Sequence, residues 1–146
     1  MGGHPWWYLV PYEKDVASSL EALRQREFKA GRYNPAEPFP RFPVDLNHAP
    51  GCRHASIEDA REDSDADGTR SILDVSQLSA RPDYDAVAPL DDDELTEFFG
   101  TTRPTAEEVE DCDDLFEQIE RGQGVYVVIY EDDKPSQIFF AGYSYD

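Results

Sequence analysis

The stretch that decides the fold is GVYVVIYEDDKPSQIFFAGY, residues 124–143. Two runs of β-branched and aromatic residues, Gly124 to Glu131 and Ser136 to Tyr143, flank a polar linker at residues 132–135. Such runs favour strands, and a short linker with turn-forming residues joins them into a β-hairpin. Both runs are almost continuously apolar, which is typical of strands with covered faces. We therefore predict a central hairpin that packs against helices.

Outside the hairpin, the clearest elements lie near the N-terminus. Residues 6–12 (WWYLVPY) are aromatic and β-branched, and they predict a strand that ends at Pro11. Asp15 is a capping residue for a helix that runs to about Ala30, and Gly31 is its stop signal.

The middle of the chain is less regular. Ser56 begins a short helix, and the apolar run within residues 70–75 favours a strand. Residues 81–91 are rich in Pro and Asp and predict a loop, and an Asp-x-x-Glu pattern begins a short helix over residues 91–100. We expect an α+β fold, in which an antiparallel sheet (the N-terminal strand plus the C-terminal hairpin) is packed by three to four helices.

The chain of 146 residues is long enough for one domain, spanning residues 1–146, with a substantial core. Two Trp, eight Tyr and eight Phe distinguish it from a disordered acidic chain. Residues 34–50 hold five prolines interleaved with Phe39, Phe42, Val44 and Leu46. We expect a proline-rich loop there that lays its apolar side chains on the body of the protein.

Charge is distributed very unevenly. Residues 1–53 hold seven Lys/Arg and six Asp/Glu, whereas residues 54–146 hold six and twenty-six, so the acidic C-terminal half carries nearly all of the net charge of −19. This surplus disfavours direct binding to nucleic acid or to anionic lipid. The chain has no apolar run long enough to span a membrane, no secretion signal and no disulfide framework, so we expect a cytoplasmic protein.

The highest density of carboxylates falls on a helix that we predict from a capping box at Thr105 and Glu108 to a stop at Gly122. An apolar stripe runs along it, and most other positions are acidic. Like charges at this spacing repel by tenths of a kcal/mol each, roughly, so the array is costly. It is either a solvated face or a docking face for a basic protein. The docking hypothesis predicts contacts at Glu107, Glu110, Asp111, Asp114 and Glu117, with a second cluster at Asp91, Asp92 and Asp93.

Residues 63–74, DSDADGTRSILD, resemble the EF-hand calcium loop over a dozen residues. That loop has acidic ligands at positions 1, 3 and 5, glycine at 6 and a carboxylate at 12. The resemblance implies a Ca²⁺ site whose ligands are Asp63, Asp65, Asp67, the Thr69 carbonyl, Ser71 and Asp74. The sequence departs from the pattern at position 12, which is Asp in place of Glu, and at position 8, where Arg70 replaces an apolar residue. An Asp-rich turn without a metal is the alternative.

His48, Cys52 and His54 form a second candidate site within seven residues. Imidazoles and a thiolate are zinc ligands, and a Cys/His pair is also a nucleophile–base combination. The spacing matches no standard zinc finger, so an incidental loop cysteine is the alternative. Cys112 falls on the apolar stripe and is expected to be buried.

We therefore expect a non-enzymatic acidic module, without a required cofactor, that neutralises or regulates a basic partner protein as an inhibitor or a DNA mimic would. Two alternatives remain: a small enzyme that uses His48, Cys52 and His54, and a Ca²⁺-binding module at Asp63–Asp74. The sequence does not indicate the oligomeric state.

Overall fold

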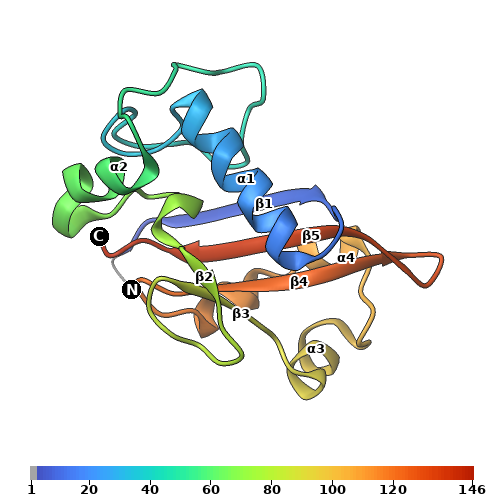
Figure 1. The fold of residues 1–146 in the computed structure, drawn as a ribbon. Helices are drawn as coiled ribbons and strands as arrows, with labels where there is room; N and C mark the ends of the chain where they lie inside the picture. The colour runs from blue at the N-terminus through green and yellow to red at the C-terminus, as the bar shows by residue number, and fades with distance from the viewer. Residues whose placement is uncertain (1–2) are drawn as a thin grey trace.

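The computed structural model describes residues 3–146, and within them a five-stranded mixed sheet forms the centre of the molecule (Figure 1). The strands, in spatial order, are β1 (Pro5–Pro11), β5 (Lys134–Tyr143), β4 (Gly124–Glu131), β3 (Ala86–Pro89) and β2 (Gln77–Leu78). β5 is antiparallel to both β1 and β4, whereas β3 is parallel to both β4 and β2.

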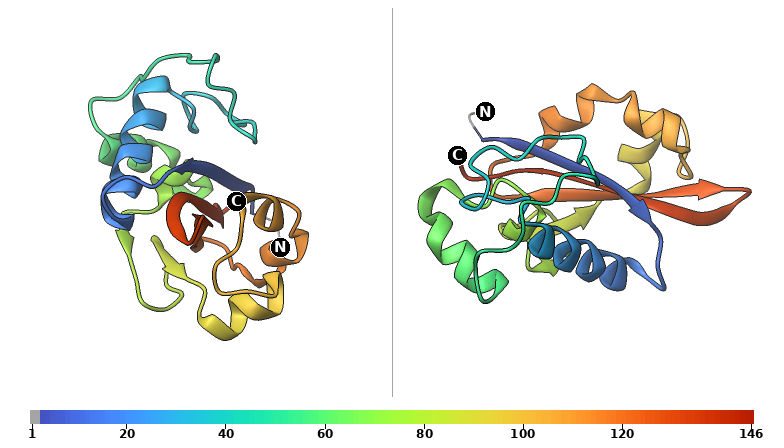
Figure 2. Two further views of the ribbon diagram at one scale, coloured as in Figure 1. Left: turned by 90° about the vertical axis from the view of Figure 1, so that its right-hand side faces the viewer. Right: turned by 90° about the horizontal axis from the view of Figure 1, so that it is seen from above.

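Helices cover both faces of this sheet, so the molecule has three layers (Figure 2). One side holds α1 (Val16–Ala30) and α2 (Ile57–Ser64), with the short 3-10 helices η1 (Asp65–Asp67) and η2 (Ile72–Asp74). The other side holds α3 (Asp92–Phe99), α4 (Ala106–Glu110) and the 3-10 helix η3 (Asp113–Gln118).

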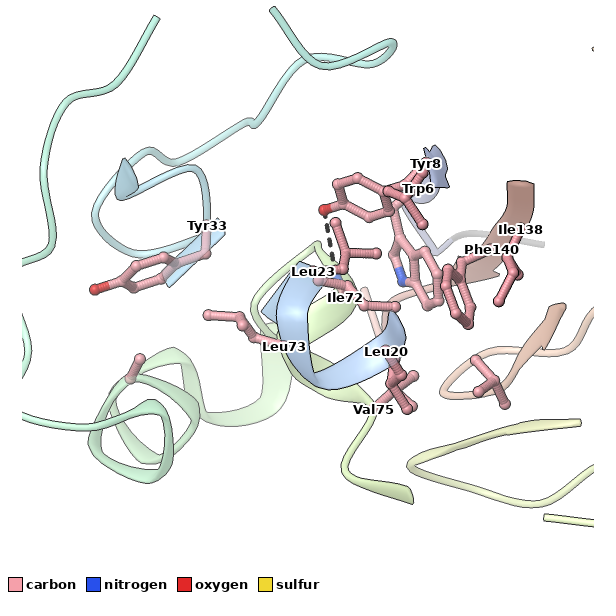
Figure 3. Close-up of a cluster of buried hydrophobic side chains, with 13 residues drawn as sticks. Trp6, Tyr8, Leu20, Leu23, Tyr33, Ile72, Leu73, Val75, Ile138 and Phe140 are labelled. Atoms are coloured by element: carbon pink, nitrogen blue, oxygen red, sulfur yellow. Dashed lines mark hydrogen bonds between the residues drawn. The ribbon is translucent and has the colours of Figure 1, made fainter. Parts of the chain in front are cut away.

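The alternation of side chains along the strands explains the two cores. On β1, Trp6 and Tyr8 point to the α1 side, where they pack with Ile72 and other fully buried residues (Figure 3). The Tyr8 hydroxyl accepts a hydrogen bond from the Ile72 backbone N–H at 3.3 Å. Trp7 and Leu9 point the opposite way and join the core under α3, α4 and η3. Successive residues of a strand therefore supply different cores.

The predicted hairpin is confirmed. β4 and β5 pair from Gly124 and Gly142 to Glu131 and Lys134. The turn between them has two residues, Asp132 and Asp133, with φ of 52° and 60°. Positive φ at both central residues is the geometry of a type I′ turn, which matches the twist of the strands.

The predicted helix starts are also confirmed. The Asp15 carboxylate accepts from the Ser18 backbone N–H at 2.7 Å and caps α1, which ends at Gly31 with φ of 75°. Ser56 caps α2 in the same way. Capping boxes open α3 and α4, and the side-chain and backbone hydrogen bonds of both are present.

The α+β class is confirmed, but the prediction of an antiparallel sheet packed by three to four helices was correct only in part, because the described residues form a mixed sheet with four α-helices and three 3-10 helices. The three strands β1, β5 and β4 are antiparallel as expected, but β3 and β2 extend the sheet in parallel. β3 lies inside residues 81–91, which the sequence predicted as a loop. A chain that returns through helices reaches the next strand in a parallel direction, and α3, α4 and η3 form that connection between β3 and β4.

Two further elements differ from the prediction. The helix expected over 105–122 ends at Glu110, and a 3-10 helix follows from Asp113. Asp is a poor helix former and the carboxylates repel one another, which disfavours a continuous α-helix. The chain forms a 3-10 helix instead, and its apolar residues stay in the core. The predicted strand over residues 70–75 is absent, and the chain there forms η2 (Ile72–Asp74), because the Ser71 hydroxyl accepts from the Leu73 backbone N–H and favours a turn.

Candidate functional site

Half of the twenty-six acidic residues of the C-terminal half lie in one segment on one side of the sheet. Residues 91–121, which we call the acidic layer, contain thirteen Asp/Glu and two Arg, a net charge of −11. They form α3, α4 and η3, which lie on the side opposite α1 (Figure 2). Their apolar side chains, among them Phe99, Val109 and Leu115, fill the core beneath. Since the core takes the apolar positions, the carboxylates are left on the outside.

All eight predicted contact residues are exposed. The structure brings them into one layer but not onto one helix face, because the helix breaks after Glu110. Asp91 also has a structural role, since its carboxylate accepts from the Glu94 backbone N–H at 2.8 Å. Of the two arginines, Arg103 pairs with Asp133 in the β4–β5 turn at 3.6 Å.

An apolar groove of about 620 Å³ runs beside the acidic layer, along the outer edge of β1. We call it the β1 groove. Most of its lining comes from three segments that are distant in the sequence: β1, residues 43–46 of the proline-rich loop, and residues 109–116 of the acidic layer. Arg26 of α1 and Phe139 and Tyr143 of β5 complete it. Its apolar lining includes Trp7, Leu9, Val44, Leu46, Phe116 and Phe139.

Trp7 ties the two walls of the groove together. Its ring packs edge-on against Phe116 of η3, with ring centroids 5.8 Å apart, and tilts against Phe42 of the proline-rich loop at 5.5 Å. Leu46 on the loop is 64% exposed although it is a large apolar residue. An exposed leucine at the rim of an apolar groove is a natural contact for a bound apolar side chain.

Among the charged side chains that line the groove, carboxylates outnumber guanidinium groups. Glu110 and Asp113 line it from the acidic layer, and Arg26 lines it from α1. Arg26 is already engaged, because its Nε donates to Glu27 Oε2 at 2.8 Å. Two carboxylates and one guanidinium therefore line the groove, and the carboxylates are in excess.

Buried charges hold the proline-rich loop in place. The Glu27 carboxylate is fully buried and accepts two hydrogen bonds from Arg32, at 2.8 and 2.6 Å. These bonds raise the pKa of the Arg32 guanidinium above its usual value. Arg32 Nη1 then donates to the backbone oxygen of His48 at 2.6 Å. The Glu27–Arg32 ion pair thus anchors the proline-rich loop at His48.

The residues of the EF-hand-like segment point in different directions. Asp63 pairs with His54 at 2.9 Å, and Asp67 lies 4.0 Å from Arg70. Asp74 turns inward, where its Oδ1 accepts from both the backbone N–H and the hydroxyl of Thr69. No group of three or more His, Cys, Asp or Glu side chains in residues 3–146 is arranged to hold a metal ion. The structure does not bring the implied ligands together.

The His48, Cys52 and His54 set is not assembled either. His48 Nε2 lies 3.1 Å from Glu37, and both ring nitrogens of His54 have partners, at 2.8 Å from the Tyr33 hydroxyl and 2.9 Å from Asp63. Cys52 is an exposed free thiol. With its nitrogens occupied, His54 is not positioned to act as a base for Cys52.

No protein-family model, curated protein or solved structure shows significant similarity to this chain. Across residues 3–146, no helix has the length and apolar character that crossing a membrane requires.

Sequence reasoning found the acidic layer but not the β1 groove. It indicated that the proline-rich loop packs on the body, and that residues 6–12 form a strand. The sequence does not indicate that Trp7 contacts both Phe42 and Phe116, because these three residues are far apart in the chain.

Proposed function

We propose that this chain is a non-enzymatic binding protein that docks a basic partner protein across its acidic layer, with an apolar side chain of the partner in the β1 groove. The proposal is supported by the position of the acidic layer directly beside the β1 groove. Glu110 and Asp113 belong to the acidic layer and also line the groove, so one ligand meets both features at once.

The two features have different physical roles. An array with a net charge of −11 attracts a basic surface over roughly a Debye length, which speeds association and repels acidic competitors. The groove supplies affinity, because burying one large apolar side chain contributes about 1.5–3 kcal/mol. A basic partner with an aromatic or aliphatic anchor satisfies both, whereas a phosphate backbone is repelled.

Docking would cover the basic surface of the partner and would therefore block what that surface binds. A protein that uses its basic face to contact nucleic acid would lose that contact while docked here. This supports neutralisation or regulation of the partner in preference to chemistry, since the candidate Cys/His pair is not assembled.

The test uses defined peptides. One set alternates Lys and Arg around a central Trp, and a matched set carries Ser in place of Trp. We expect the Trp peptides to bind roughly tenfold more tightly, and both sets to weaken as salt is raised. Fluorescence anisotropy gives the Kd of each peptide.

Charge-matched variants locate the site. Glu110→Gln with Asp113→Asn removes two charges at the groove and should weaken binding of the Trp peptide about tenfold. Glu13→Gln with Asp59→Asn removes two exposed charges elsewhere and should leave binding within about twofold. Equal effects of the two pairs, or affinity that ignores salt, would overturn the proposal.

A further inference from the structure

A second cavity, of about 340 Å³, lies on the side of the molecule that carries α2 and shares no lining residue with the β1 groove. We call it the Asp74 pocket. Its walls are α2, the Gly68 turn and the C-terminal Tyr145, and Asp74 lines it from η2. The function proposed above does not involve this pocket.

Asp74 is the unusual residue here. It is only 5% exposed, and its Oδ1 accepts from the Thr69 backbone N–H at 2.7 Å and from the Thr69 hydroxyl at 2.9 Å. Its other oxygen, Oδ2, is buried without a hydrogen-bond partner among the described residues. Gly68 leaves space beside it, since a Cβ atom at that position would lie 2.9 Å from Oδ2. A buried acceptor without a donor costs free energy, and a ligand that brings the donor removes that cost.

The donors nearest to this pocket are directed elsewhere. The Tyr145 hydroxyl donates to Asp85 Oδ1 at 2.7 Å, and Arg61 lies 3.4 Å from the same oxygen. Asp85 therefore engages both groups and leaves the Oδ2 atom of Asp74 unmatched. The remaining acidic lining residues, Glu58, Glu62 and Asp65, are exposed at the rim.

We propose that the Asp74 pocket binds an organic cation with N–H donors, a guanidinium or an alkylammonium group, which donates to Asp74 Oδ2 while the rim carboxylates accept from its remaining N–H groups. A guanidinium suits the site best, because its fork of donors reaches two acceptors at once. A hard metal ion suits it less, because such ions need several oxygens on one centre and residues 3–146 offer no such group.

The cation requires the ionised carboxylate, so binding should depend on pH. Burial, the largest effect, raises the pKa of Asp74 to about 6. Arg61 opposes this rise, whereas Asp85 adds to it. Tyr8, Tyr145 and the three rim carboxylates also face or couple to Asp74. We expect the affinity to rise roughly tenfold per pH unit below the pKa of Asp74 and to level off above it.

The probes are butylguanidinium and butylammonium, with butanol as the neutral control, titrated to about 50 mM and followed by NMR. We expect saturable shifts at Tyr145 and Gly68 with the cations and none with butanol. Asp74→Asn should weaken binding about ten- to a hundredfold. Asp59→Asn is the matched control, because Asp59 is exposed on α2 outside the pocket, and it should change affinity less than threefold.

A peptide that carries one Arg forms the second arm of the experiment. Binding of the peptide but not of butylguanidinium would identify the cation as a side chain of a partner. Should Asp74→Asn fail to fold, the pH profile of the unmodified chain still decides the question. No saturation with any cation, unchanged affinity in Asp74→Asn, or a profile without a rise toward pH 6 would overturn the proposal.

Discussion

The buried carboxyl of Asp74 makes a quantitative prediction about stability. Its pKa rises from 3.8 to about 6 because burial penalises the charged form. The folded state therefore holds this proton more tightly than the unfolded state. The protonated Asp74 therefore contributes its full share to the free energy of unfolding when the pH is below the pKa of the unfolded state. This contribution is lost as the pH rises through the pKa of the folded state. The difference between the two pKa values amounts to about 3 kcal/mol.

Asp74→Asn removes this titration. Its side-chain oxygen can still accept from Thr69, whereas its amide nitrogen takes the place of Oδ2 and is an unpaired donor, at a cost of about 1–3 kcal/mol that does not vary with pH. We expect the stability of the variant, relative to the unmodified chain, to increase by about 2 kcal/mol between pH 4 and pH 7, most of the full difference.

Urea denaturation at several pH values, followed by Trp fluorescence, measures this difference. Subtracting the two proteins at each pH cancels the other carboxylates, which titrate alike in both. Asp59→Asn, an exposed control, should give a flat difference. A flat difference for Asp74→Asn as well, or one that falls with pH, would refute the reasoning that burial controls this group.

Three other substitutions test the fold. Glu27→Gln should lower the free energy of unfolding, measured in urea, by about 3–5 kcal/mol, because it leaves the buried Arg32 guanidinium without its ion pair. The control Glu21→Gln, at an exposed ion pair, should cost under about 1 kcal/mol. Similar costs for both would contradict the buried pair. Asp133→Gly should raise stability by up to about 1 kcal/mol, since φ is 60° there, and a lower thermal midpoint would argue against the type I′ turn. Gly142→Ala should cost about 1–3 kcal/mol or more in urea, because its Cβ would lie 2.3 Å from the Trp6 ring, and an unchanged midpoint would mean that the packing there is looser than described.

Local chemistry allowed most of the elements to be predicted. Asp15, Ser56 and Thr105 each accept a backbone hydrogen bond at a helix start, and that preference is visible in the sequence alone. The hairpin was predictable for the same reason, since its strands and its turn are adjacent in the chain. These elements depend on neighbours within a few residues.

The errors arise where distant contacts decide the structure. β3 contains two alanines and a proline and resembles a loop, but its place beside β4 makes it a buried strand. Residues 70–75 have an apolar pattern that suits a strand, yet Thr69, Ser71 and Asp74 form side-chain hydrogen bonds that curl them into a turn beneath α1.

The candidate sites likewise divide into those that depend on nearby residues and those that depend on distant contacts. Composition identified the acidic layer, because thirteen carboxylates lie close together in the sequence. The β1 groove could not be predicted, since its walls come from segments far apart in the sequence, among them residues 5–9, 43–46 and 109–116. Asp74 was singled out as a calcium ligand, whereas its burial depends on packing that the sequence does not reveal.

The most direct test of the docking proposal is the location of the bound peptide. Amide chemical shifts of the labelled protein are recorded as the Lys/Arg peptide with a central Trp is added. We expect the largest changes at residues 43–46 and 107–117, around the groove and the adjoining carboxylates, with little change in α2. Changes centred on α2, or spread evenly over the surface, would contradict the proposal that the acidic layer and the β1 groove form one binding site.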